Sequence, residues 1–550
     1  MSKLFLIKIW RGDRLRFEEE LKYKIKQIEI RYYVVFISTI ICGLLAHLYQ
    51  FTNKSFNFDE LGQTPAGFGA GIELGRWGLQ LVGDTVGLFF RTYSLPMING
   101  MITLICVALS ACVLVEIFDI KDYVCCFLIG GILATFPALV GTYFFMFTAP
   151  YYGLAMFLSC VAAKYIVKGI LDKGADFRNI IIGLLCLTLS IGIYQSYCSV
   201  TLCIILMDVI LRLYLKRGEW KSILIRGILY CVIFITSLGT YIGIAKIATK
   251  ISGIALSGYR GIEDMGSVNL GALAYSIIKT YINYFSLMTK EDIYQINPIF
   301  LVNVIIVIIN IVLVVIIVNR LREKETIINK IGFIITIVLM PIAMFFPEVM
   351  TQARGGVYSL MTYSVAFVFI LPIVIYEKRN RVLLQVEGNL VSEKRDIIGR
   401  TLCISVFINI LVYIWFANGN YQALQYTTYH DLAYFETLAT QVKSLDGYTP
   451  DLKVALVGDG FEDPTFKAGS LMGEYFDIAG KWDTNINYFN NVYLWKSYLG
   501  FTPEIIEFRD SGYLSEMDEV KAMPCYPEDG SIAIVGDTVV IKASNKTSKE

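Results

Sequence analysis

The chain carries little charge for its length. Only 17% of its 550 residues are Asp, Glu, Lys or Arg, and 55% are hydrophobic. Soluble domains carry about 25% charged residues. Acids near the middle of the long apolar runs are also missing, which argues against an ion-coupled pump or symporter. The composition indicates a membrane protein without the buried charges of a transporter.

Residues for metal, disulfide and nucleotide chemistry are scarce. The 2 histidines, His47 and His430, are far apart in sequence, which nearly excludes a zinc site and a Ser-His-Asp triad. Of the 12 cysteines, all but Cys525 lie in or beside apolar segments without paired spacing, so they are interpreted as small buried hydrophobic residues. No Walker motif is present and no GxGxxG follows a predicted strand, which argues against ATP or NAD chemistry.

The apolar runs predict a polytopic α-helical membrane protein. About 20 apolar residues are needed to cross the hydrocarbon core. Residues 1–31 are basic and amphipathic and lack a signal-peptide cleavage site, so they are predicted to be a cytoplasmic segment. About eleven transmembrane helices are predicted, at 32–50, 95–117, 122–143, 150–169, 178–194, 196–215, 222–246, 298–319, 329–346, 356–376 and 400–417. The two helices within 178–215 are predicted to divide near Tyr194–Tyr197.

The loops between these runs differ in charge, which predicts the orientation of the chain. With the N-terminus inside, every second loop is basic, whereas the connections 143–150 and 194–197 contain no Lys or Arg. The positive-inside rule then places the N-terminus in the cytoplasm and the C-terminus outside. The predicted domains are the segment 1–31, a transmembrane domain 32–417, and a small extracytoplasmic α/β domain 418–550 with strands at 453–458 and 531–541.

The first predicted external loop, 51–94, carries the main candidates for catalysis. Asp59 and Glu60 are adjacent acids beside a membrane span, where a carboxylate can act as a general base toward a hydroxyl group. The two acids could also hold a divalent cation such as Mg²⁺ or Mn²⁺, or only cap a helix. Because neighbouring side chains point in different directions, only one of the two is expected to take part in catalysis, and Asp59 is the preferred candidate.

Cationic and aromatic residues on the same predicted side could bind a phosphate and a sugar. Arg76 offers a planar fork for phosphate oxygens and Trp77 a face for a sugar ring, although such a pair is also a common interfacial anchor. Three further cations could join Arg76 at a lipid phosphate, namely Arg260, Lys279 and Arg354. Since a nucleotide-sugar donor would be cytosolic, the external position of these residues favours a donor delivered on a lipid.

Four motifs together resemble the membrane glucosyltransferases of the GtrII type. They are Asn57–Glu60 after the first span, Gly75–Gly78, Arg354 in a late outer loop, and Val454–Gly458 in the tail. The resemblance implies a GT-C-like fold with its catalytic acid in the first external loop, at Asp59 or Glu60, and matches Arg76 to the GRW motif. It further implies transfer of a sugar, expected to be glucose, from a polyprenyl-phosphate donor to a bacterial surface polysaccharide such as O-antigen.

The expected reaction is an inverting single displacement. The acid would deprotonate an acceptor hydroxyl, which attacks the anomeric carbon, and Arg or Lys side chains would meet the charge of the departing lipid phosphate. The expected partners are the lipid-linked donor, the glycan acceptor, membrane lipids, a lipid-linked-sugar flippase and a donor-making synthase, and no nucleic acid. Two alternatives stay open: a flippase or transporter of lipid-linked sugars, and a membrane-anchored assembly protein whose external domain does the work.

Overall fold

The computed structural model describes residues 28–56, 58–63, 67–91, 94–171, 174–215, 220–262, 269–289, 305, 308–309, 312, 327–354, 356–387, 393–458, 492–506 and 511–545. Nearly all of the predicted cytoplasmic segment 1–31 lies outside these ranges. The predicted span 298–319 also lies outside them, apart from four isolated residues.

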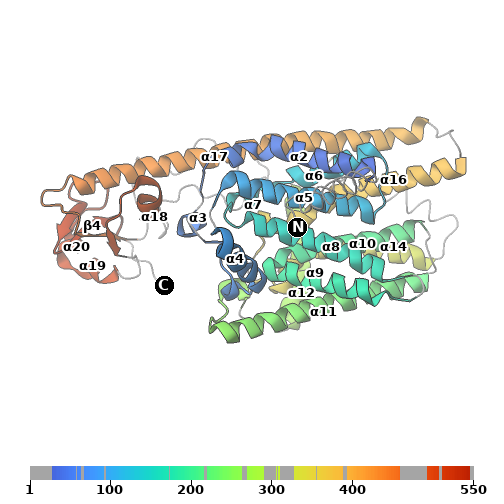
Figure 1. Cartoon of the computed structure of the whole chain (residues 1–550), viewed down its shortest axis with the longest axis horizontal. Coiled ribbons are helices and arrows are strands. Elements are labelled where there is room, and N and C mark those ends of the chain that lie inside the picture. Colours follow the sequence, from blue (N-terminus) through green and yellow to red (C-terminus); the bar gives the residue numbers. More distant parts are fainter. Residues whose placement is uncertain are drawn as a thin grey trace, which may run out of the picture.

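The described chain forms an elongated helical bundle with a small sheet at one end (Figure 1). By length and apolar composition, 7 helices of the described part can cross a membrane, so the chain is a multi-pass membrane protein. They are α2 (Ile30–Thr52), α5 (Pro96–Ile117), the pair α6 (Tyr123–Thr135) and α7 (Pro137–Phe144), α8 (Ala149–Gly169), η2 (Gln195–Tyr197) with α10 (Cys198–Leu215), α11 (Trp220–Ser252), and part of α17 (Glu393–Lys443). Two shorter apolar helices are α9 (Phe177–Ile193) and most of α14 (Ile327–Met344).

Breaks between helices follow local sequence. The predicted division near 194–197 is confirmed, because α9 ends at Ile193 and α10 begins at Cys198. Pro137 separates α6 from α7, since proline lacks an N–H and clashes with the preceding turn. The predicted span 356–376 differs from the structure: η4 (Ser359–Met361) and η5 (Tyr363–Ala366) precede α16 (Phe367–Glu387). Side-chain hydroxyls compete with the helical pattern there, as when Thr362 Oγ1 donates to the Ser359 carbonyl at 2.7 Å.

Helix α17 connects the bundle to the sheet. It has 51 residues, about 76 Å at 1.5 Å per residue, whereas the hydrocarbon core is about 30 Å thick. The predicted span 400–417 is therefore only one part of α17, and the rest extends beyond the membrane toward the sheet (Figure 1). The predicted domain boundary between 417 and 418 lies inside this helix.

The C-terminal domain contains a mixed sheet in the order β2-β1-β4-β3. Strand β1 (Lys453–Val457) is parallel to β2 (Glu504–Ile506) and β4 (Thr538–Lys542), and β3 (Ile532–Val535) is antiparallel to β4. The strands predicted at 453–458 and within 531–541 are confirmed. The hydrophobic core of this domain also contains Phe56 and Leu61 from the first loop, so the loop and the domain pack as one body.

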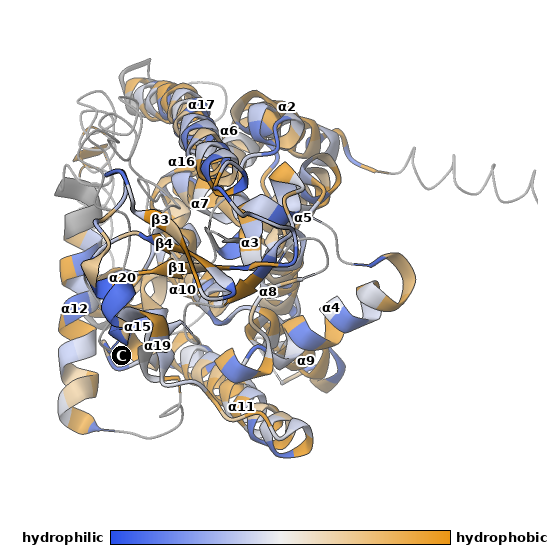
Figure 2. Cartoon of the chain, turned by 90° about the vertical axis from the view of Figure 1, so that its left-hand side faces the viewer, coloured by the Kyte–Doolittle hydropathy of each residue, from blue (hydrophilic) through white to orange (hydrophobic). Residues whose placement is uncertain are grey.

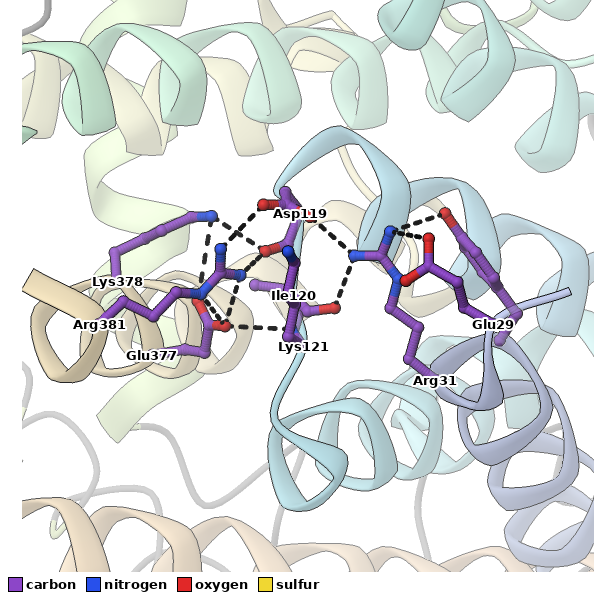
Figure 3. Close-up of polar contacts among 9 residues, drawn as sticks. Glu29, Arg31, Asp119, Ile120, Lys121, Glu377, Lys378 and Arg381 are labelled. Atoms are coloured by element: carbon purple, nitrogen blue, oxygen red, sulfur yellow. Dashed lines mark hydrogen bonds and ion pairs between the residues drawn. The ribbon is translucent and has the colours of Figure 1, made fainter. Parts of the chain in front are cut away.

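A network of ion pairs lies at the other end of the bundle from α3 (Phe58–Gln63). Helix α2 begins beside Arg31 and ends just before α3, which separates these two regions by the length of one span. Figure 3 shows Arg31 and Arg381 on either side of Asp119, each 2.8 Å from a carboxylate oxygen, and Arg381 also pairs with Glu377. This network joins α2, the α5–α6 connection and α16.

Candidate active site

Asp59 and Glu60 lie in the first turn of the short helix α3. A helix of 6 residues is too short to be stable by itself, because nucleation costs more than so few hydrogen bonds return. Its position therefore depends on tertiary contacts. The two acids have different surroundings, since Glu60 is fully buried and Asp59 is half-buried.

Glu60 is engaged by partners within the protein. The Lys54 ammonium and the Ser94 hydroxyl both donate to Glu60 Oε1. Lys54 also donates to Ser94 Oγ at 2.8 Å and to the Ser94 carbonyl at 3.3 Å, which closes the cluster. The negative charge of Glu60 is thus neutralised, as a buried carboxylate requires.

Asp59 is the acid whose carboxylate is left to react with a substrate. Burial raises the pKa of Asp59 to about 6, and the positive charge of Arg76 opposes part of this increase. Within the described ranges, no Lys or Arg lies within ion-pair distance of its carboxylate. A carboxyl group with this pKa can accept a proton near neutral pH more readily than an exposed aspartate can.

Arg76 lies where the chain turns into α4 (Trp77–Phe90), after η1 (Ile72–Leu74). Gly75 has φ of 69°, a left-handed conformation that favours glycine, and it places Arg76 at the N-cap of α4. The Arg76 guanidinium donates to the Tyr152 hydroxyl at 3.2 Å and lies 5.0 Å from the centre of the Tyr194 ring. The rings of Tyr152 and Tyr194 stack on each other with centres 4.1 Å apart. These two tyrosines hold the guanidinium without neutralising it.

Gln195 links the η1 turn to α11. Its side-chain amide donates to the Leu74 carbonyl at 2.8 Å and to the Tyr241 hydroxyl at 3.0 Å. The break between α9 and α10 therefore has a structural role, because its residue Gln195 fixes the turn that precedes Arg76.

Trp77 packs inward against α9. A Cβ atom on Gly192 would lie 2.6 Å from the Trp77 ring, and one on Gly78 would lie 2.8 Å from the Gly192 carbonyl carbon. The glycines therefore allow α4 to approach α9 closely, and α4 lies beside α9 in Figure 2. The end of α4 from Leu88 to Phe90 is exposed and apolar, which is typical of a helix that lies in the membrane interface.

Three buried polar atoms in this region have no hydrogen-bond partner among the residues that the structure describes. They are Arg76 Nε, Trp77 Nε1 and Thr148 Oγ1. A buried donor without an acceptor costs about 1–3 kcal/mol. Such atoms mark places where a ligand can supply the missing oxygen.

The remaining predicted cations form a second group. Lys279, in α12 (Leu270–Thr289), lies 3.4 Å from the buried carboxylate of Glu348, in α15 (Phe346–Met350), and donates to the Ala353 carbonyl at 3.3 Å. Arg354 is exposed and packs along Gly261 in η3 (Tyr259–Gly261). The side chain of Arg260 lies outside the described part. A hydrogen bond of 2.8 Å from Ser257 N–H to the Glu73 carbonyl joins the chain before η3 to the turn before Arg76.

The residues that surround Arg76 and Lys279 were not among those predicted from the sequence. Tyr152 and Tyr194 lie at the ends of the predicted spans 150–169 and 178–194, Gln195 lies in the connection 194–197, and Glu348 follows the predicted span 329–346. The absence of Lys and Arg from 143–150 and 194–197 predicts that these connections lie on the same side as Arg76, but it does not identify the individual side chains.

Across the described ranges, no three His, Cys, Asp or Glu side chains gather as metal ligands. The contact with Lys54 occupies Glu60, which speaks against one cation shared by the two adjacent acids.

Comparison with known proteins adds a family. The family model for glucosyl transferase GtrII matches residues 48–369, more than half of the chain and the whole region from Asp59 to Arg354. No curated protein sequence matches the chain. Among solved structures, the chain is similar to the apo oligosaccharyltransferase of Archaeoglobus fulgidus at 10% identity and a TM-score of 0.36, covering 78% of this chain and 63% of that one.

Proposed function

We propose, on the premise that the chain belongs to the glucosyl transferase GtrII family, that it transfers glucose from a polyprenyl-phosphate donor to a surface polysaccharide such as O-antigen. Membership of this family makes it a membrane glycosyltransferase. The GT-C-like architecture belongs to the same proposal. The assignment of the site rests on the surroundings of Asp59. Its carboxyl group has a raised pKa and no ion pair in the described part, and the charge of Arg76 is close enough to lower that pKa in part.

Asp59 is the general base of the proposed reaction. Its carboxylate takes the proton of an acceptor hydroxyl as that oxygen attacks the anomeric carbon of the donor sugar. The bond between the anomeric carbon and the phosphate oxygen breaks in the same step, so the configuration inverts. Glu60 is unsuited to this role, because its charge is already met by Lys54 and Ser94.

Arg76 is the first ligand of the departing phosphate. Its Nε has no acceptor in the described chain, and a phosphate oxygen would supply one. The increase of negative charge on the lipid phosphate as the bond breaks is then met by a preorganised cation. Trp77, Arg260, Lys279 and Arg354 complete the proposed donor site, with Lys279 held in place by Glu348.

The end of the bundle that carries α3, α4 and the sheet is proposed to face the outside. The positive-inside rule assigns the basic connection between α8 and α9, which Lys168 and Arg178 flank, to the cytoplasm. This connection joins the two helix ends that lie away from α3 and α4. A lipid-linked donor would then enter from the membrane beside α4. A flippase and a synthase that supply this donor are the expected partners.

The experiment compares transfer with transport. Purified protein in lipid nanodiscs is incubated with polyprenyl-phosphate-glucose and candidate glycans, and the products are analysed by mass spectrometry. We expect a glycan heavier by one hexose from the wild type, little product from Asp59→Asn, and normal product from Asp84→Asn, which changes an exposed acid on α4. In a parallel assay with the protein in sealed vesicles, movement of the donor across the membrane without a new glycosidic bond would instead support a flippase.

A further inference from the structure

The helix that carries Asp59 is anchored in the C-terminal domain. Phe56 and Leu61, which flank the acidic pair, are 0% and 1% exposed and belong to the same hydrophobic core as Phe435 and Trp495. Ser55 Oγ donates to the Gln425 side chain on α17 at 2.6 Å. A segment with only six helical residues therefore takes its position from residues more than 350 positions later in the chain.

The contact continues through a π-helical turn of the C-terminal domain, η8 (Trp495–Leu499). The Trp495 indole N–H donates to the Phe435 carbonyl at 2.8 Å, which fixes the turn on α17. From this turn, the ring of Tyr498 packs on Phe56 with centres 4.6 Å apart. Single π-helical turns often occur at functional sites.

Tyr498 lies close to Glu60. Burial raises the pKa of the Tyr498 hydroxyl, and the negative charge of Glu60 raises it further. The hydroxyl therefore keeps its proton, and it has no hydrogen-bond partner among the described residues. Glu60 thus accepts hydrogen bonds from Lys54 and Ser94, and its charge reaches a buried phenol of the C-terminal domain.

We propose that Glu60 and Tyr498 are positioning residues through which the C-terminal domain holds Asp59 toward Arg76. The inference rests on the proposed role of Asp59 as the base. Glu60 and Leu61 fix one side of α3, and Phe56 fixes the chain just before it, whereas the carboxyl group of the adjacent Asp59 is under the influence of the Arg76 charge. The C-terminal domain is then part of the active site's support, and its removal lowers the rate of transfer.

The test separates positioning from general stability. We measure kcat, KM for polyprenyl-phosphate-glucose, and the pH dependence of kcat for Glu60→Gln, Tyr498→Phe and Tyr498→Ala. Tyr493→Phe, an exposed tyrosine at the start of the same segment, is the matched control. Unfolding temperatures in detergent are measured for each variant.

We expect Glu60→Gln and Tyr498→Ala to lower kcat about 10–100-fold, the range for a misplacement of about 1 Å. KM for the donor should stay within about twofold, because Arg76 is unchanged. The acidic limb of the pH profile should move to higher pH, since a displaced Asp59 loses the nearby charge of Arg76 that lowers its pKa. Tyr498→Phe keeps the ring on Phe56 and should show a smaller change in the same direction.

Three results would overturn the inference. They are a kcat and pH profile for Tyr498→Phe and Tyr498→Ala equal to those of Tyr493→Phe, a loss of kcat that only follows a loss of folded protein, or an increase in KM alone. Tyr498→Phe decides the question if the larger changes prevent folding, because it removes one buried oxygen without creating a cavity. Full activity of Asp59→Asn would instead contradict the proposed function itself.

Discussion

The two ends of the bundle differ in whether their central charged residues, Asp119 at one end and Asp59 and Arg76 at the other, have ion-pair partners. At the end shown in Figure 3, Asp119 is shared by Arg31 and Arg381, and Arg381 also pairs with Glu377. At the sheet end, Arg76 is held by tyrosines, and within the described ranges neither it nor Asp59 has an ion-pair partner. The first arrangement satisfies its charges within the protein, and the second leaves them for a ligand. This difference supports the assignment of the site more strongly than the presence of charge alone.

The substitution with the largest expected effect on transfer, apart from that of Asp59, is at Arg76. The variant Arg76→Gln removes the cation that would meet the phosphate, so kcat/KM should fall about 10²–10³-fold, as for the loss of one donor to a developing charge. The unfolding temperature should fall only slightly, because the loss of the Arg76 contacts with Tyr152 and Tyr194 is offset by the removal of a buried Nε–H that has no acceptor in the described chain. Steady-state transfer assays beside thermal unfolding in detergent measure both. Equal activity of Arg76→Gln and wild type would remove Arg76 from the site.

The pH dependence of transfer sharpens the same contrast. Because burial raises the pKa of Asp59 to about 6, kcat should fall about tenfold for each pH unit below that value as the base becomes protonated. The raised pKa means that folding favours the protonated form, so this contribution to stability is lost as pH rises through about 6. Asp59→Asn should therefore be at least as stable as wild type above pH 6. A flat profile of kcat between pH 5 and 7 would contradict the assignment of Asp59 as the base.

At the opposite end, the expected effect is on stability. Burial would raise the pKa of Asp119, but hydrogen bonds from Arg381 and Arg31 outweigh it and hold the pKa well below its usual range. This contribution to stability is present above the unfolded pKa of about 3.9 and is lost as pH falls through the lower folded value. Asp119→Asn should cost about 1 kcal/mol, since the Asp119 side chain is 49% exposed. Unfolding followed by circular dichroism, with Asp84→Asn as the control, checks this value.

The smallest expected effect concerns Lys279. It contacts Glu348 and the Ala353 carbonyl and belongs to the second group of cations. Lys279→Met should raise KM for the donor about 2–10-fold with kcat nearly unchanged, as for an interaction made equally in the ground and transition states. Glu348→Gln is the informative companion, because it keeps the lysine and removes the carboxylate. A fall in kcat equal to that of Arg76→Gln would move Lys279 into the reacting centre.

Much of the fold could be predicted because its signals are local. Apolar runs of sufficient length correspond to spans, the polar break at 194–197 separates α9 from α10, and a short continuous apolar run marks β1. The continuity of α17 could not be read in this way, since Asn418 and Asn420 suggest a break. In the structure each asparagine amide donates to a carbonyl one turn earlier, at 2.9 Å, so both are accommodated within the helix.

The candidate site was predictable in its members but not in their division of roles. Asp59, Glu60 and Arg76 follow from local motifs, and their assignment as site residues stays a prediction. That Glu60 pairs with Lys54 and with Ser94, 34 residues later, depends on the path of the whole first loop. The tyrosines around Arg76 are 76 and more residues away in sequence and carry no local signal.

One measurement tests the central claim most directly, namely that unpaired charge marks the site and paired charge supports the fold. Rates of glucose transfer from polyprenyl-phosphate-glucose, normalised to folded protein, are compared for Asp59→Asn and Asp119→Asn in the same nanodiscs. We expect Asp59→Asn to lose about 10²–10⁴-fold of the rate and Asp119→Asn to keep the rate of the wild type. Equal losses in the two variants, or the larger loss in Asp119→Asn, would contradict the account.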